Sequence, residues 1–186
     1  GENETSWPVQ GKAPIIMDNL IADGACQPMI VVMTYGMTND TRIGGLAGFN
    51  VKDGFEKVLC DELIPFIDKN FRTIAKRNSR AMCGLSMGGM ETHSITLDRP
   101  QVFGYWGLFS GGQYSVEEIK KLAKADQPKL MFMSTGSKEN PVGINQAAAD
   151  LKAAGFNAVG HVSEGTAHEF LTWRRALKTV APLLFK

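Results

Sequence analysis

The sequence predicts an α/β fold with a mainly parallel sheet, and three observations support this fold class. Apolar runs alternate with stretches of helical periodicity from residue 28 onward. The runs 28–34 and 129–135 are mostly apolar, which is typical of strands that helices cover on both faces. The connecting stretches are short, with no internal repeat and no linker. We therefore expect a single domain over residues 1–186 in which strands and helices alternate.

The expected elements follow from local periodicity and from turn residues. Residues 1–12 and 35–51 are rich in polar and turn residues and are expected to be loops. Pro65 should kink an amphipathic helix over 53–70. We expect the other helices at 13–23, 87–97, 116–124, 142–154 and 169–184, and strands at 28–34, 81–85, 103–110, 129–135 and 158–163.

The composition fits an ordinary soluble globular protein. Hydrophobic residues make up 44% of the 186 residues, charged residues make up 21%, and the net charge is +1. This balance offers no basic footprint for nucleic acid, and no apolar run approaches the roughly 18 residues of a membrane span. The cysteines, Cys26, Cys60 and Cys83, lack metal-ligand spacing, so we expect no metal site, and we expect Cys83 to be a buried free thiol.

One motif dominates the chain. Gly84-Leu85-Ser86-Met87-Gly88 lies between an apolar strand and a helix, which is the G-x-S-x-G pattern of a nucleophile elbow. A serine at such a sharp turn has strained backbone angles, and side chains two residues to either side would collide. Ser86 is therefore the candidate nucleophile, and the alternative is a glycine-rich turn with an incidental serine.

A serine needs a base to accept its proton, and the chain offers three histidines. His93 lies about two turns along the elbow helix, where a packing role is expected. His161 falls within the last expected strand. His168 follows that strand in a loop that precedes a helix, which is where this class of fold carries its base. We therefore predict that His168 is the base.

The base needs an acid to orient it, and Glu139 is the leading candidate. It lies in the turn after the strand 129–135, at the carboxyl end of the expected sheet. One alternative is that Glu139 is a solvated loop carboxylate without a catalytic role. The other is that one of four other carboxylates is the acid. These are at the opposite end of the sheet, within a helix, or adjacent in sequence to the base: Asp126, Asp150, Glu164 and Glu169.

The order Ser86, Glu139, His168 predicts acyl transfer. His168 would take the Ser86 proton as the serine attacks an ester carbonyl, and Glu139 would stabilise the charged imidazole. An acyl-enzyme would form, and water would release the acid. The backbone N–H of Met87 and one N–H from an upstream loop would bind the oxyanion.

Several segments resemble one family of known esterases. The chain is similar to the esterase D-like α/β-hydrolases, and within that group most similar to the feruloyl esterases of carbohydrate esterase family 1. The resemblance covers nearly the whole chain. It rests on Gly84-Leu85-Ser86-Met87-Gly88-Gly89, Phe103-Gly104, Phe109-Ser110-Gly111, the segments 18–24 and 61–73, and Gly165-Thr166-Ala167-His168-Glu169-Phe170 with Trp173.

The resemblance implies a three-layer α/β-hydrolase sandwich and a secreted or periplasmic serine carboxylesterase that needs no cofactor. Its substrates would be hydroxycinnamoyl esters, such as ferulate, on plant cell-wall polysaccharide or oligosaccharide. Trp7 and Trp173 could present aromatic surface to such a substrate, and packing is the alternative for each. Other activities of the same fold are acetylxylan, siderophore or thioester hydrolysis, and a non-catalytic carbohydrate-binding relative is a further alternative.

The chain departs from the family pattern at two points. The family acid is usually Asp, whereas this chain offers Glu139. The family also places several strands, and a His-Gly-rich loop with the second oxyanion donor, before the point that corresponds to Gly1. We therefore expect an N-terminally truncated catalytic domain that lacks its first strands. Its uncovered sheet edge would need a missing N-terminal segment or self-association.

Overall fold

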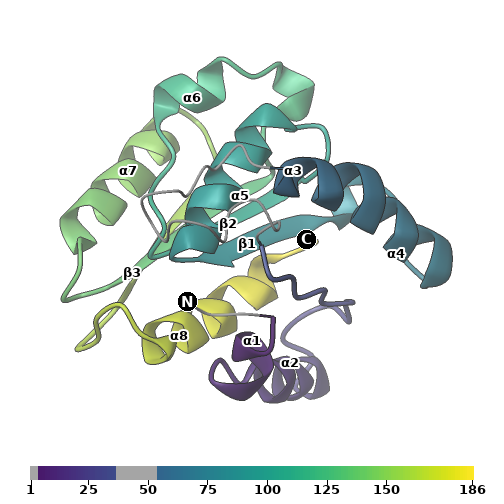
Figure 1. Ribbon diagram of the computed structural model, residues 1–186. Coiled ribbons are helices and arrows are strands. Elements are labelled where there is room, and N and C mark those ends of the chain that lie inside the picture. Colours follow the sequence, from purple (N-terminus) through teal and green to yellow (C-terminus); the bar gives the residue numbers. More distant parts are fainter. Residues whose placement is uncertain (1–3, 37–53) are drawn as a thin grey trace.

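The computed structural model describes residues 4–36 and 54–186 and is built on a parallel sheet (Figure 1). Its four strands pair in the order β1-β2-β3-β4. They are β1 (Ala81–Leu85), β2 (Tyr105–Phe109), β3 (Leu130–Gly136) and β4 (Ala158–Ser163). All three neighbouring pairs are parallel, which confirms the predicted fold class.

Helices cover both faces of this sheet (Figure 1). On one face lie α5 (Met87–Asp98), α6 (Val116–Lys120), α7 (Pro141–Ala153) and a helical stretch formed by α3 (Phe55–Lys57), a π-helix (Val58–Leu63) and α4 (Ile64–Asn70). On the other face lie α8 (Phe170–Val180), α1 (Ser6–Val9) and α2 (Ala13–Ala22). Short 3₁₀ turns occupy Arg77–Ser79, Lys124–Asp126 and Ala181–Leu183. Among the helices of the described residues, none is long and apolar enough to cross a membrane.

The alternation of side chains along the central strands builds two cores. Trp106 and Leu108 of β2 and Met131 of β3 pack beneath α5 and α7. Phe109 and Phe132 point to the opposite face, among the residues that pack with α8. Successive strand residues point to opposite faces, so a strand buried on both sides must be apolar at nearly every position.

The strand predicted at 28–34 is wrong. Residues 27–36 have no regular secondary structure, and Ile30, Val31 and Val32 are 50%, 50% and 45% exposed. An apolar run becomes a buried strand only where a neighbouring strand pairs with it, and within the described residues no strand does so. The composition of a segment shows that it is apolar but does not show which strand, if any, pairs with it.

Two further segments differ from expectation. Within the predicted N-terminal loop, Ser6–Val9 forms a turn of helix, and Trp7 packs edge-on against Phe109 with ring centroids 5.9 Å apart. In the predicted helix over 53–70, a π-helix precedes Pro65, and the Ile64 N–H donates to the Leu59 carbonyl. Proline has no N–H and collides with the preceding turn, so a widened turn at this point accommodates it. Most of the predicted loop over 35–51 lies outside the described residues.

Candidate active site

Ser86 occupies the turn between β1 and α5. Its backbone angles are φ 52° and ψ −119°, a sparsely populated conformation for a residue with a side chain. The turn is held because the Ser86 N–H donates to the Phe109 carbonyl at 2.8 Å, which continues the pairing of β1 with β2. The serine side chain is thus presented at the carboxyl end of the sheet, as the motif predicts.

The glycines around Ser86 allow this turn to pack closely. A Cβ atom added to Gly84 would lie 1.9 Å from the Gly88 carbonyl oxygen, and one added to Gly89 would lie 2.7 Å from the Cα atom of Gly111. A Cβ atom added to Gly88 would meet nothing within 4 Å. The expectation that both motif glycines relieve a collision therefore holds for Gly84 and is wrong for Gly88. The second close approach belongs to Gly89.

His168 lies between Ser86 and Glu139. Its Nε2 atom is 2.7 Å from Ser86 Oγ, and its Nδ1 atom is 2.7 Å from Glu139 Oε2. An ionised carboxylate can only accept, so the proton of a neutral imidazole sits on Nδ1, and Nε2 accepts from the serine hydroxyl. The His168 side chain is 48% exposed and that of Glu139 is 17% exposed. The imidazole is therefore accessible from solvent, and the carboxylate that contacts it is more enclosed.

Three donors hold the second carboxylate oxygen of Glu139. Oε1 accepts from the Gly136 N–H at 2.7 Å, from Ser110 Oγ at 2.8 Å and from Thr135 Oγ1 at 3.2 Å. Burial raises the pKa of the Glu139 carboxyl, but the hydrogen bonds from Gly136, His168 and Ser110 outweigh burial, so the pKa lies below its ordinary value. The carboxylate is therefore ionised at neutral pH and fixed in orientation.

Trp173 of α8 completes this cluster. Its indole Nε1–H donates to Ser110 Oγ at 3.1 Å, and its ring lies edge-on to His168 with centroids 5.2 Å apart. Ser110 and Thr135 were not predicted as site residues. A signal was available, because Ser110 directly follows β2 and Thr135 lies near the end of β3. The carboxyl ends of neighbouring parallel strands lie side by side, so both positions fall close to Glu139.

The other two histidines lie away from Ser86. His93 stacks on Tyr114 with centroids 4.9 Å apart, and its Nε2 atom is 3.3 Å from Glu118 Oε1. His161 lies in β4 and stacks on Phe132 with centroids 6.0 Å apart. His93 therefore packs against neighbouring side chains, as expected, and His161 lies within the last strand of the sheet, as expected.

The alternative acids have other surroundings. Asp126 ends a 3₁₀ turn before β3, and Asp150 of α7 accepts from the Gln146 side chain at 2.8 Å. Glu169 accepts from the backbone N–H of Ala167 at 3.1 Å. Glu164 lies just beyond β4, where its carbonyl oxygen accepts from Arg175. The carboxylate that contacts the Nδ1 atom of His168 is that of Glu139.

Met87 is the first residue of α5, so its N–H has no acceptor within the helix. The positive end of the helix dipole lies at this point, which favours a developing negative charge. The stretches 4–36 and 54–186 contain no group of three or more His, Cys, Asp or Glu side chains that could hold a metal ion.

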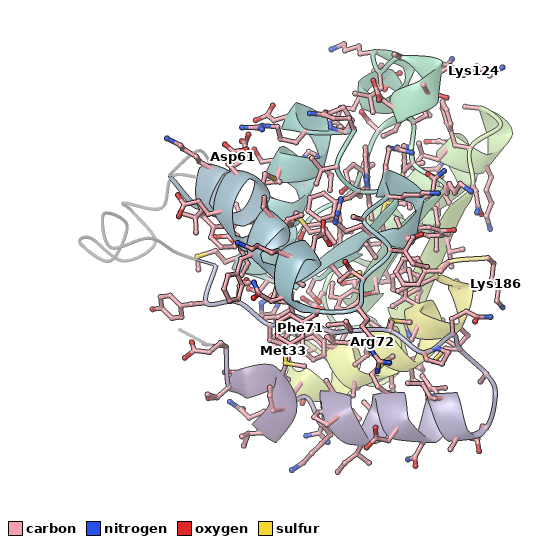
Figure 2. The ribbon with its side chains drawn as sticks, turned by 90° about the vertical axis from the view of Figure 1, so that its right-hand side faces the viewer. Met33, Asp61, Phe71, Arg72, Lys124 and Lys186 are labelled. Carbon is pink, nitrogen blue, oxygen red and sulfur yellow. The ribbon has the colours of Figure 1, made fainter. Side chains whose placement is uncertain are left out.

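A cleft of about 1350 Å³ opens beside the site and runs along the whole of β1. Ser86 and His168 lie at one end of it, and residues 28–36 form the opposite wall. In Figure 2, the segment that carries Met33 passes between α2 and the helical stretch that ends near Phe71, and both residues line the cleft. Cys83 also lines it and is exposed, so the prediction of a buried thiol is wrong because this flank of β1 is open.

A parallel sheet between two layers of helices, with a serine at a strained strand-to-helix turn and a histidine and an acid on later loops, defines the α/β-hydrolase class. The model of the Esterase family matches residues 4–181. The chain therefore belongs to the Esterase family.

Comparison with individual proteins shows which sequences and folds the chain resembles. The chain is 64% identical, over all of its 186 residues, to an endo-1,4-beta-xylanase/feruloyl esterase from Xylanibacter ruminicola, and it spans 25% of that relative's length. It is similar in fold to a ferulic acid esterase from Anaeromyces mucronatus, with a TM-score of 0.77, 20% identity, and coverage of 99% of this chain and 75% of that one. The feruloyl esterase module of Clostridium thermocellum gives a TM-score of 0.76 at 22% identity, covering 100% of this chain and 74% of that one.

Proposed function

We propose that this chain is the catalytic portion of a serine carboxylesterase that cleaves feruloyl and related hydroxycinnamoyl esters through an acyl-enzyme. The observation that carries the proposal is the continuous hydrogen-bonded line from Ser86 through His168 to Glu139. A serine is a weak nucleophile unless an adjacent base takes its proton, and this line supplies both the base and the group that orients it.

The proposed reaction has two halves. In the first, Ser86 Oγ attacks the ester carbonyl while its proton passes to His168 Nε2, and the imidazolium then protonates the leaving alcohol. In the second, His168 activates a water that releases the acid and regenerates the serine. Glu139 stays ionised throughout and stabilises the imidazolium.

The developing oxyanion would be bound by the N–H of Met87. This group lies one residue beyond the nucleophile and at the N-terminus of α5, where backbone donors and the helix dipole both favour negative charge. A donor of this kind is worth about 10²–10³ in kcat. We expect a second donor from polypeptide beyond the described residues.

Two observations support an aromatic acyl group on a plant polysaccharide. The relative with 64% identity is named a xylanase/feruloyl esterase, and one solved structure of similar fold contains ferulic acid. Because such a polysaccharide lies outside the cell, we propose that the enzyme is secreted or periplasmic.

The test compares hydrolysis of feruloylated arabinoxylan oligosaccharide, acetylated xylan, a siderophore ester and a thioester by the natural polypeptide that contains these residues. Its Ser86→Ala variant is the control. Preferential release of ferulate, with fluorophosphonate labelling of Ser86, is the expected result. Preference for another ester would assign one of the alternative hydrolase activities. Absence of both turnover and labelling would favour a non-catalytic carbohydrate-binding protein.

The siderophore and thioester alternatives each have support from a fold relationship. The enterobactin esterase of Shigella flexneri gives a TM-score of 0.71 at 18% identity. The S-formylglutathione hydrolase of Staphylococcus aureus gives a TM-score of 0.56 at 15% identity. At these identities the likeness concerns the fold, so the substrate comparison above decides between the activities.

We also propose that one additional β-strand, from polypeptide outside this sequence, fills the cleft beside β1. Within the described part of the chain, β1 pairs with β2 alone, so one row of its backbone N–H and C=O groups faces the cleft. The opposite wall carries the exposed side chains of Ile30 and Val32. The solved esterases with this fold are longer chains, which is consistent with an added strand.

Hydrogen exchange and mass measurement test this strand. The 186-residue polypeptide alone is expected to self-associate or to exchange rapidly the β1 amides that face away from β2, and a longer natural polypeptide is expected to protect those amides. A monomeric 186-residue polypeptide with protected β1 amides and an unchanged rate of Ser86 labelling would contradict the proposal.

A further inference from the structure

We propose that Ser110 is a positioning residue that fixes the Glu139 carboxylate for catalysis, and that Trp173 orients the Ser110 hydroxyl for this task. The inference rests on the proposed esterase function. The observation behind it is a pair of consecutive hydrogen bonds, called the relay below. Trp173 Nε1–H donates to Ser110 Oγ at 3.1 Å, and Ser110 Oγ–H donates to Glu139 Oε1 at 2.8 Å.

The chemistry of the three groups gives the relay one direction. An indole N–H can only donate, and an ionised carboxylate can only accept. The single hydroxyl proton of Ser110 is therefore directed at Glu139, while a lone pair of the same oxygen accepts from Trp173. Trp173 is only 5% exposed. Its N–H would therefore lose its hydrogen-bond acceptor if the Ser110 side chain rotated away.

The backbone of Ser110 indicates that its hydroxyl is needed. Its φ is 50°, a left-handed conformation that glycine adopts without cost and that other residues rarely adopt. The two following residues, Gly111 and Gly112, are glycines, so the local turn is otherwise built from the residue type that suits it. A serine at the strained position costs stability in the fold and supplies a donor that glycine lacks.

The turn that carries Ser110 is anchored from two sides. The Ser110 N–H donates to the Ser134 carbonyl of β3 at 2.8 Å, so Ser110 is fixed to the strand that leads to Glu139. A Cβ atom added to Gly111 would lie 2.5 Å from the Cα atom of Gly89, so the same turn packs directly on the first turn of α5. The donor is therefore held on rigid elements, as precise positioning requires.

A glutamate needs such a donor more than an aspartate does. Its side chain has one more rotatable bond, so a carboxylate held only by His168 through Oε2 would sample several rotamers. The donors on Oε1 remove that freedom, and misplacement of a catalytic group by about 1 Å can cost on the order of 10² in rate. Ser110 thus compensates for the longer acid.

The experiment compares Ser110→Ala with Ser110→Gly in the natural polypeptide that contains these residues. Both variants remove the hydroxyl, but only the glycine relieves the left-handed backbone. We expect both to lower kcat about tenfold with KM changed less than twofold, while Ser110→Gly keeps or raises Tm. The matched control is Ser134→Ala, since the hydroxyl of Ser134 is buried nearby but donates to the Leu108 carbonyl. This control should keep the wild-type kcat.

Trp173→Phe tests the second half of the relay. It removes the indole N–H and keeps an aromatic ring beside His168, so a smaller loss in kcat is expected. The double variant with Ser110→Ala should be no slower than Ser110→Ala alone, because Trp173 acts through the hydroxyl. Additive losses would overturn the assigned role of Trp173.

Two readouts separate positioning from general stability. Loss of the donor should raise the pKa of the Glu139 carboxyl, measured by NMR titration, because Glu139 loses a hydrogen bond to its charged form. It should also shift or broaden the downfield proton resonance of His168 Nδ1–H. A kcat within twofold of wild type in both variants, or recovery of activity in Ser110→Gly, would overturn the inference. A wild-type protein that neither turns over esters nor labels at Ser86 would instead overturn the proposed function, and the His168 resonance would still report on the contact.

Discussion

The Oγ atom of Ser86 lies 2.7 Å from the Nε2 atom of His168, although 82 positions separate the two residues in the sequence. The two side chains meet because β1 and β4 are parallel strands of one sheet, so the segments that follow them emerge at the same edge. The contact is exposed, as it must be if an ester is to reach the serine. The fold therefore brings a candidate nucleophile and base together at an accessible position.

Substitution of Ser86 by alanine should remove the esterase activity. Without the hydroxyl no acyl-enzyme can form, so we expect kcat to fall by on the order of 10⁴–10⁶. Fluorophosphonate labelling of the protein should disappear at the same time. The variant keeps a Cβ atom at the strained turn, so its Tm should stay close to wild type. Residual turnover near the wild-type rate would mean that another group is the nucleophile.

The variants Glu139→Gln and Glu139→Asp separate the effect of the negative charge of the acid from the effect of its side-chain length. The glutamine keeps the length and loses the negative charge that stabilises the imidazolium, so kcat should fall about 10²–10⁴-fold. The aspartate keeps the charge but is shorter by about 1.5 Å, one carbon–carbon bond. It cannot span Gly136 N–H and His168 Nδ1 together, so a loss on the order of 10² is expected. Full activity in both variants, measured as kcat on a feruloyl ester, would exclude Glu139 as the acid.

The elements that were predicted correctly are those that can be recognised from the composition of their own segment. Two apolar strands, at 103–110 and 129–135, contain or overlap β2 and β3, because a strand with helices on both faces is apolar at nearly every position. The strand expected at 158–163, whose pattern is weaker, matches β4. The contact between His168 and Glu139 could also be anticipated, since both residues follow the carboxyl ends of parallel strands.

The features that were missed depend on which segments become neighbours. The run 28–34 has the composition of a strand, yet it pairs with no strand of the described residues. The donors around Glu139 depend on the register of β2 and β3, where Phe109 lies opposite Ser134 and so places Ser110 beside the end of β3. Composition and periodicity contain no information on pairing or register. The strand ends place Ser110 and Thr135 at the same edge of the sheet as Glu139, but the sequence does not show that their hydroxyls donate to it.

The ionisation of Glu139 should contribute to stability in a defined pH range. The pKa of its carboxyl is lower in the folded protein than the usual value of about 4.3, so its contribution is complete above that value and is lost as the pH falls through the lowered pKa. Urea denaturation at a series of pH values should therefore show a difference in unfolding free energy between wild type and Glu139→Gln. That difference should be largest at neutral pH and should shrink below about pH 4.3.

His168 is the titratable group in direct contact with this carboxylate, so the pH series should be repeated in a His168→Gln background. The pH-dependent difference should persist there, because the Gly136 and Ser110 donors remain. A difference that stays constant to pH 3 in both backgrounds would contradict a lowered pKa.

The two motif glycines should differ sharply in what they tolerate. Gly84→Ala places a Cβ atom 1.9 Å from the Gly88 carbonyl oxygen, and both groups belong to backbone that cannot swing away. We expect a loss of about 3 kcal/mol or more, which corresponds to roughly 6 °C or more in Tm for a protein of this size. Gly88→Ala meets nothing within 4 Å and lies in the first turn of α5, so its Tm should stay level or rise by a few degrees. Thermal unfolding of the two variants beside wild type gives the comparison. Equal decreases in Tm would mean that both glycines are needed for the backbone conformation of the turn and that the close approach at Gly84 does not determine the difference.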